Sequence, residues 1–261
     1  MEQAIPLLIL GLAAGVLSGM FGIGGGVVIV PVLVTLFSYE LKPAVATSLG
    51  ALLLPVGIFA VIEYYRAGKM KISVSAIIAL GLIVGGWFGS QLALNLPVDT
   101  LQRLYGAFLL YAAWRFMEPR KWLADIRAGT KPVEVVGHET GASFISLLIL
   151  GLGAGVVSGM FGVGGGIVIV PALVAFLKFD QKLAVGTSLG ALLLPVGLGG
   201  VISYYQANMF NVRDSALIAA GLVVGALGGA RLALGLPSTT VKRLYGIFLL
   251  FVGLRFLLQI G

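Results

Sequence analysis

The sequence predicts an all-α polytopic membrane protein that is built from two homologous repeats. Three observations predict this class: the chain is very apolar, its second half repeats its first, and glycines interrupt the first apolar segment of each half. Apolar residues make up 59% of the 261 residues, and charged residues make up only 10%. The chain also contains 39 glycine residues. A soluble protein has roughly 25% charged residues. So few charges cannot cover the surface of a soluble domain, which excludes a cytosolic enzyme and a nucleic-acid-binding domain.

The composition also limits the chemistry that the chain can perform. It contains no cysteine, and its one histidine, His138, lies in a polar stretch. Disulfides, thiolate metal sites and a Ser-His-Asp triad therefore lack residues that they need. We expect no catalytic residue, no metal site and no cofactor. The net charge of +7 is interpreted as loop charge that sets the orientation of membrane segments, and not as a surface for nucleic acid.

An internal duplication defines the organisation of the chain. Residues 7–57 align with residues 147–197 at a constant offset of 140 without a gap, and 37 of these 51 positions are identical. The stretch between the halves is the only long polar segment. We therefore predict one transmembrane repeat over residues 1–118, a polar linker over 119–142 and a second transmembrane repeat over 143–261.

Each half contains four apolar segments. They cover 5–37, 44–62, 72–95 and 100–117 in the first half, and 143–177, 183–202, 214–236 and 244–260 in the second. A helix needs about 20 residues to cross a bilayer, so the last three segments of each half fit one span each. We expect Pro55 and Pro195 to kink the second segment of each half.

The first segment of each half is too long for one simple span and too short for two. In the first half it contains Gly22, the run Gly24–Gly26 and Pro31. Adjacent glycines are poor helix formers, at a cost of about 1 kcal/mol each. These residues predict a broken helix, or a re-entrant hairpin that turns at Gly24–Gly26.

The positive charges indicate how the two halves are oriented. If all eight segments cross the membrane, one side of it holds 10 of the 17 Lys and Arg residues. If the first segment of each half enters the membrane and returns, one side holds 13 of the 17. The positive-inside rule prefers the second arrangement. Arg66, Lys69 and Lys71 also lose their charge in the second half, while other loops gain one. This exchange predicts inverted repeats, a common transporter design, although drift of loop charges gives the same pattern.

The glycine-rich breaks are the first candidate site. A helix that restarts after Gly26 presents free N–H groups and the positive end of its dipole, both of which attract anions. Two copies that face each other would form a paired cradle. The predicted ligand contacts are Gly22, Gly24, Gly25 and Gly26 with Gly162, Gly164, Gly165 and Gly166. Close helix packing is the alternative interpretation of these glycines.

Hydroxyl groups in the second segment of each half are the next candidates. Thr47, Ser48, Thr187 and Ser188 could coordinate an oxyanion without placing a charge in the membrane. A hydrogen bond to the carbonyl of the preceding helical turn is the alternative for each of them. Ser18 and Ser158 are further candidates for the same cavity. The ladders Gly81, Gly85, Gly89 and Gly221, Gly225, Gly229 are interpreted as helix packing.

At these residues the chain resembles a known family. The repeated element SGMFGxGGGxxxVP, followed by ATSLGALLLP or GTSLGALLLP, is similar to the TauE/SafE sulfite exporter family, also called the toluenesulfonate uptake permease family. The resemblance covers nearly the whole chain. It implies about eight hydrophobic segments in a bacterial or archaeal inner membrane, in agreement with the segments above.

The resemblance implies a secondary transporter of sulfite, sulfonates or related small sulfur anions, with export as the expected direction. The residues themselves predict only an anion at paired helix ends, near the midplane between the two repeats. A passive anion channel, or an importer of another organic anion, is the alternative function. The expected partners are the small anionic substrate and the lipid bilayer. A homodimer is the oligomer that we consider.

Overall fold

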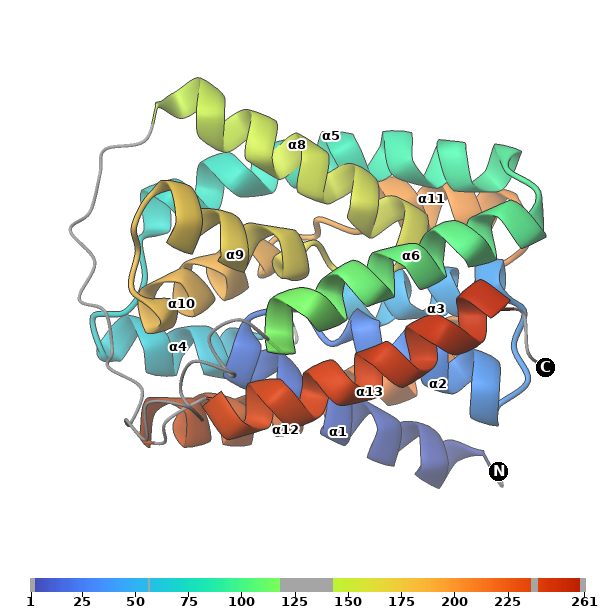
Figure 1. Cartoon of the computed structure of the whole chain (residues 1–261), viewed down its shortest axis with the longest axis horizontal. Helices are drawn as coiled ribbons and strands as arrows, with labels where there is room; N and C mark the ends of the chain where they lie inside the picture. The colour runs from blue at the N-terminus through green and yellow to red at the C-terminus, as the bar shows by residue number, and fades with distance from the viewer. Residues whose placement is uncertain (1–2, 56, 118–142, 236–238, 259–261) are drawn as a thin grey trace. The chain divides into compact units, whose positions relative to one another are not determined.

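The computed structural model describes residues 3–55, 57–117, 143–235 and 239–258, and this part of the chain folds into twelve α-helices without a strand. The predicted linker at 119–142 lies outside the described residues. Helix labels follow Figure 1. The first half contributes α1 (Ala4–Phe21), α2 (Gly26–Leu36), α3 (Leu41–Leu53), α4 (Ile58–Arg66), α5 (Ile72–Asn95) and α6 (Val98–Met117) (Figure 1).

The second half repeats this order of helices. It contributes α8 (Phe144–Phe161), α9 (Gly166–Phe176), α10 (Gln181–Leu192), α11 (Leu198–Gln206), α12 (Val212–Gly235) and α13 (Thr239–Leu258). The first segment of each half is two helices, as the glycines predict. The second segment is also two helices, and α3 and α4 meet at an angle of 51°. The predicted bend at Pro55 is therefore confirmed, and it lies between two separate helices.

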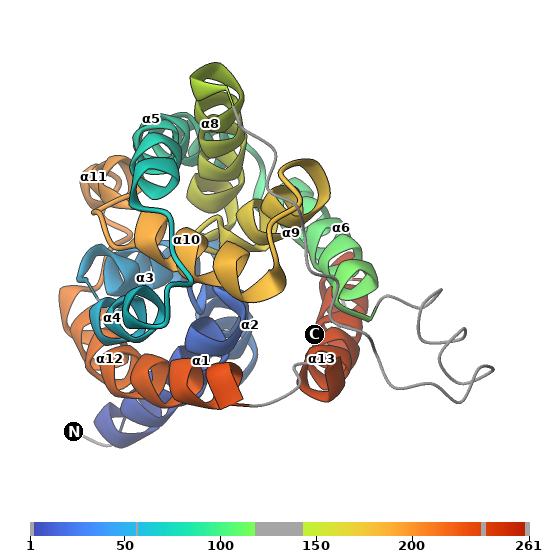
Figure 2. The same ribbon diagram turned by 90° about the vertical axis from the view of Figure 1, so that its left-hand side faces the viewer.

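The compact units do not coincide with the sequence repeats, because each unit takes matching helices from both halves. One unit contains α1 to α5 with α8 to α12, and the other contains α6 and α13. Seen end-on, α3 and α10 of the larger unit lie between the α5–α8 pair and the α1–α12 pair (Figure 2). The central helices are therefore covered by two long-helix pairs.

Glycines allow the long helices to pack closely across the two halves. A Cβ atom on Gly11 would lie 2.1 Å from the carbonyl oxygen of Ile218, and one on Gly19 would lie 2.2 Å from that of Ala226. The partner number rises with the glycine number, so α1 and α12 run parallel. Gly81, Gly85 and Gly89 pack against α8 in the same way. The packing interpretation of these ladders is confirmed.

The chain returns after α2 to the end of the molecule where α1 begins. Because α1 and α12 are parallel with Gly11 beside Ile218, Asp214 lies level with the first turns of α1. The hydroxyl of Tyr39, which follows α2, donates a hydrogen bond to Asp214. The α1–α2 pair thus enters the unit and comes back.

The matching helices of the two halves run in opposite directions. In Figure 1, α1 starts at the right, where the N-terminus is marked, and α8 starts at the left. The glycine breaks show the same relation, because Gly22 faces Gly166, Gly24 faces Gly164 and Gly26 faces Gly162. The two breaks therefore cross in antiparallel register at the centre of the larger unit.

The smaller unit is a pair of antiparallel helices. Gly106 of α6 faces Leu257 of α13, and Leu110 faces Gly253. The ring of Tyr105 packs edge-on against Phe256, with a centroid distance of 5.2 Å. Equivalent helices of the two repeats thus pair with each other.

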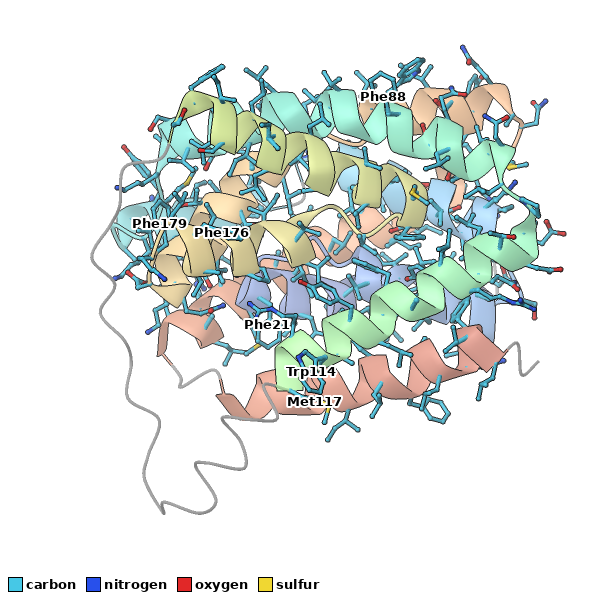
Figure 3. The ribbon with its side chains drawn as sticks, turned by 45° about the horizontal axis from the view of Figure 1, so that its top comes forward. Phe21, Phe88, Trp114, Met117, Phe176 and Phe179 are labelled. Atoms are coloured by element: carbon cyan, nitrogen blue, oxygen red, sulfur yellow. The ribbon has the colours of Figure 1, made fainter. Side chains whose placement is uncertain are left out.

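The outer faces of the long helices are apolar. Trp87 and Phe88 of α5 are about half exposed, and Phe88 points away from the bundle (Figure 3). Within the described residues, α1, α5, α8 and α12 are each long and apolar enough to cross a bilayer, and the bent α3–α4 pair is a fifth candidate. These features are those of a multi-pass membrane protein.

Candidate functional site

The two glycine breaks have a backbone conformation that side chains disfavour. Gly22, Gly24 and Gly25 have φ values of 69°, 81° and 80°. Gly22 ends α1 and donates its N–H to the carbonyl of Ser18, and Gly25 is the N-cap of α2. The second copy has the same conformations at Gly162, Gly164 and Gly165. Only glycine adopts such angles at low cost, so the breaks are fixed by sequence.

The breaks also cross too closely for any side chain between them. A Cβ atom on Gly26 would lie 1.9 Å from the carbonyl oxygen of Gly162, and one on Gly166 would lie 2.0 Å from that of Gly22. A Cβ atom on Gly24 would be 3.4 Å from the Cα of Gly164. These distances show the close packing that was the alternative interpretation of the glycines, whereas ligand contact at them stays a prediction.

Serines from the central helices hold each break from the opposite repeat. The hydroxyl of Ser48 donates to the carbonyl of Gly162 at 2.7 Å, and that of Ser188 donates to Gly22 at 2.8 Å. Both serines are fully buried. Neither serine donates to the carbonyl of its preceding helical turn. Each donates to a carbonyl of the opposite repeat, so the two hydrogen bonds connect the repeats.

The predicted threonines lie beside the starts of the long helices α5 and α12. The Thr187 hydroxyl accepts the N–H of Lys71 at 3.2 Å. Thr47 is fully buried, and its hydroxyl has no hydrogen-bond partner among the described residues. The Thr47 and Thr187 carbonyls accept hydrogen bonds from Ser215 and Ser75. None of these threonine or serine side chains of α3 and α10 lines the central cavity.

A small cavity lies beside the crossing point. Its volume is about 20 Å³, which is close to the space that one water molecule needs. Equivalent residues of both repeats line it, so it lies on the pseudo-twofold axis that relates them. The lining residues are Ser18, Gly24, Leu49, Leu52 and Gly57 with Ser158, Gly164, Leu189, Leu192, Val196 and Gly197.

Hydroxyl groups and helix N-termini are the polar groups of this cavity. Ser18 and Ser158 are each 5% exposed, and neither hydroxyl makes a hydrogen bond within the described residues. Gly57 and Gly197 are the N-caps of α4 and α11, while Gly24 and Gly164 directly precede those of α2 and α9. Four positive helix ends therefore border the cavity.

Comparison with known proteins identifies the family. The family model described as "Sulfite exporter TauE/SafE" matches residues 7–256. The chain belongs to the TauE/SafE sulfite exporter family. Proteins of this family are membrane transporters and not enzymes. No solved structure matches the chain.

Several curated relatives resemble this TauE/SafE protein. A probable membrane transporter protein of Methanocaldococcus jannaschii is 35% identical over 211 residues, which is 78% of this chain and 73% of the relative. The probable membrane transporter protein YdhB of Bacillus subtilis is 26% identical, covering 87% of this chain and 89% of the relative. A second Bacillus subtilis relative, YunE, is 24% identical, covering 98% and 97%.

Charged side chains of the TauE/SafE protein lie at the two ends of the larger unit. Near the end where α5 begins, Lys69 pairs with Asp180 at 3.0 Å, and Arg231 pairs with Glu63 at 3.0 Å. Burial opposes ionisation of Asp180, but the N–H of Leu183 and the Lys69 ammonium outweigh it and hold the pKa of that carboxyl below its usual value. No charged side chain among the described residues lines the cavity.

The structure thus sorts the predicted site residues into three groups. The glycines form the crossing or pack beside it, and Gly24 and Gly164 of this group also line the cavity. Thr47 and Thr187 lie beside the starts of α12 and α5. Ser48 and Ser188 bind the crossing from the opposite repeat. Sequence reasoning missed Gly57 and Gly197, although the prolines two residues before them signalled a helix break.

Proposed function

We propose that this protein is a secondary transporter, an exporter, of sulfite, sulfonates or related small sulfur anions, which it binds in the cavity between the two glycine breaks. One observation carries the proposal: two buried serines, whose hydroxyls have no hydrogen-bond partner among the described residues, line a cavity that four helix N-termini border. The family description supports the sulfur anion.

Hydrogen-bond donors make this cavity suitable for an oxyanion. Ser18 and Ser158 each provide an O–H donor from opposite sides of the pseudo-twofold axis. The N-termini of α2, α4, α9 and α11 add partial positive charge, which is strong in a cavity with low dielectric constant. An anion can therefore be bound without a buried lysine or arginine.

The arrangement in the membrane belongs to the same proposal. Each repeat provides a re-entrant pair, α1–α2 or α8–α9, and an interrupted span, α3–α4 or α10–α11. The long helices α5 and α12 then cross in opposite directions, which makes the repeats inverted. Irregular backbone at membrane depth is tolerated where protein buries it, as it does at these breaks. We place the protein in the inner membrane and include the homodimer in the proposal.

The size of the cavity favours a transporter over a channel. Its volume of about 20 Å³ is smaller than a sulfite ion needs together with water. The substrate can enter only if the central helices separate, and alternating separation on the two sides is the transporter mechanism. The interruptions between α3 and α4 and between α10 and α11 provide places for such movement on both sides of the cavity.

Counterflow in proteoliposomes tests the proposed function. Vesicles preloaded with unlabelled sulfite should take up labelled sulfite faster than empty vesicles, because exchange carries the site across the membrane in its loaded form. A channel would instead give conductance under voltage without accelerated exchange. If folded protein gives neither exchange nor saturable uptake of sulfite or methanesulfonate, the proposed function is wrong.

A further inference from the structure

We propose that the cavity selects its substrate by charge: it takes anions with one negative charge and rejects both dianions and neutral molecules of the same shape. This inference rests on the proposed function, because it names the charge class of substrate at the same site. It concerns Ser18 and Ser158, the walls of the cavity and the helix ends around it.

The first step is the absence of a full positive charge beside the cavity. Its described lining contains only serine, glycine, leucine and valine. Two described basic side chains at the end of the larger unit where α5 begins form ion pairs instead of reaching the cavity. Lys69 pairs with Asp180, and Arg231 pairs with Glu63, at an exposed fraction of 66% for the arginine.

The second step is the cost of removing an anion from water. This cost rises with the square of the charge, so a dianion pays about four times as much as a monoanion. Helix ends offer roughly half a unit charge each, and the serine hydroxyls are neutral donors. The attraction to these partial charges only doubles when a second negative charge is added, whereas the cost of removal from water rises about fourfold, so the balance favours one charge. A neutral molecule gains little from these partial charges.

The third step is the apolar part of the wall. Leu49, Leu52, Leu189, Leu192 and Val196 line the cavity beside the polar groups. They can contact a hydrocarbon group, while Ser18 and Ser158 donate to oxygen atoms. An alkyl sulfonate carries one charge over three oxygens, and its two ends match both kinds of wall once the central helices have separated around it. Among the forms of inorganic sulfite, the protonated monoanion fits and the dianion does not.

Three tetrahedral probes of similar size test the inference on the unaltered protein. Methanesulfonate carries one negative charge, sulfate carries two and dimethyl sulfone carries none. Thermal unfolding in detergent is followed while each probe is titrated at constant ionic strength, with gluconate as the filling anion, because a ligand that binds only the folded protein raises its stability. Methanesulfonate should raise the unfolding temperature saturably, with an affinity at least about tenfold above that of sulfate. Dimethyl sulfone should have no effect.

Protonation of sulfite provides a second measurement with the same protein. Stabilisation by sulfite should weaken as the pH rises through neutrality, because the monoanion becomes the dianion, whereas stabilisation by methanesulfonate should not change.

A positive charge in the cavity wall should shift the preference between the anions. Leu52→Lys is expected to improve the affinity for sulfate relative to methanesulfonate, and Leu52→Met is the matched control.

The outcomes separate this inference from the proposed function. Equal or stronger stabilisation by sulfate, or by dimethyl sulfone, would overturn the charge selection and leave the transporter in place. Loss of methanesulfonate binding in protein that still exchanges labelled sulfite would also overturn it. Failure of every probe, together with failure of sulfite exchange, would overturn the proposed function itself.

Discussion

The hydroxyl of Ser48 donates a 2.7 Å hydrogen bond to the carbonyl of Gly162, in the glycine break of the opposite repeat. Ser188 does the same for Gly22 at 2.8 Å. Because both pairs are buried, these contacts fix the distance between the central helices and the breaks. They couple the two repeats at the point where their backbones cross.

Replacement of both serines by alanine should therefore destabilise the protein. Ser48→Ala with Ser188→Ala leaves two buried carbonyls without their donors, at a cost of about 1–3 kcal/mol each. Thermal unfolding in detergent measures the effect. Thr47→Val is the control, because the Thr47 hydroxyl donates to no described residue. An unchanged unfolding temperature in the double variant would contradict the coupling.

Two neighbouring glycines of α8 should respond to alanine in opposite directions. A Cβ atom on Gly155 would lie 2.6 Å from the Leu82 carbonyl, whereas one on Gly153 would meet nothing within 4 Å. Gly155→Ala should cost about 1–3 kcal/mol through overpacking. Gly153→Ala should gain up to about 1 kcal/mol of helix propensity. Similar stabilities of the two variants would contradict the close packing of α5 and α8.

Equivalent positions of the two repeats should be labelled from opposite sides of the membrane. The chain has no cysteine, so Arg66→Cys and Gln206→Cys each introduce a single reactive group at an exposed helix end. A membrane-impermeant maleimide should label Gln206→Cys in intact cells, and Arg66→Cys only after permeabilisation, because the positive end faces the cytoplasm. Labelling of both from one side would exclude inverted repeats.

The Asp180 carboxyl should make a small contribution to stability that depends on pH. Its pKa is lowered in the folded protein because Leu183 and Lys69 outweigh the effect of burial. The folded protein then binds this proton less tightly than the unfolded chain. The stabilisation is full above the ordinary pKa of aspartate and is lost as the pH falls through the folded value.

Two variants of Asp180 separate its charge from its cap. Asp180→Asn keeps a side-chain oxygen for the N–H of Leu183 and removes the pairing with Lys69, so it should cost only about 0–1 kcal/mol. Asp180→Ala removes the cap as well and should cost about 1 kcal/mol more. Unfolding at several pH values measures both. An equal loss for the two variants would show that the cap contributes nothing.

The sequence predicts the helix breaks well because glycine and proline act locally. Gly22 and Gly24 adopt backbone angles that other residues disfavour, so the turn is encoded at the residues that make it. Pro55 likewise marks the bend between α3 and α4. The parallel glycine ladders were also predictable as packing, although their partner helices were not.

The composition of the cavity could not be predicted in the same way. Ser18 and Ser48 are both hydroxyls in apolar helices, and the sequence does not reveal which of them meets a cavity. The answer depends on the antiparallel crossing of Gly24 and Gly164. This contact joins residues that are far apart in the chain, and it turns Ser48 toward a backbone carbonyl.

Transport by a double variant of the two cavity serines tests the central claim most directly. Labelled sulfite uptake into preloaded proteoliposomes is compared between the unaltered protein and Ser18→Ala with Ser158→Ala, with thermal unfolding as a control for folding. Loss of two hydrogen bonds to an anion should weaken its apparent affinity about tenfold or more, at nearly unchanged stability. Uptake with unaltered affinity in the double variant would contradict an anion site in this cavity.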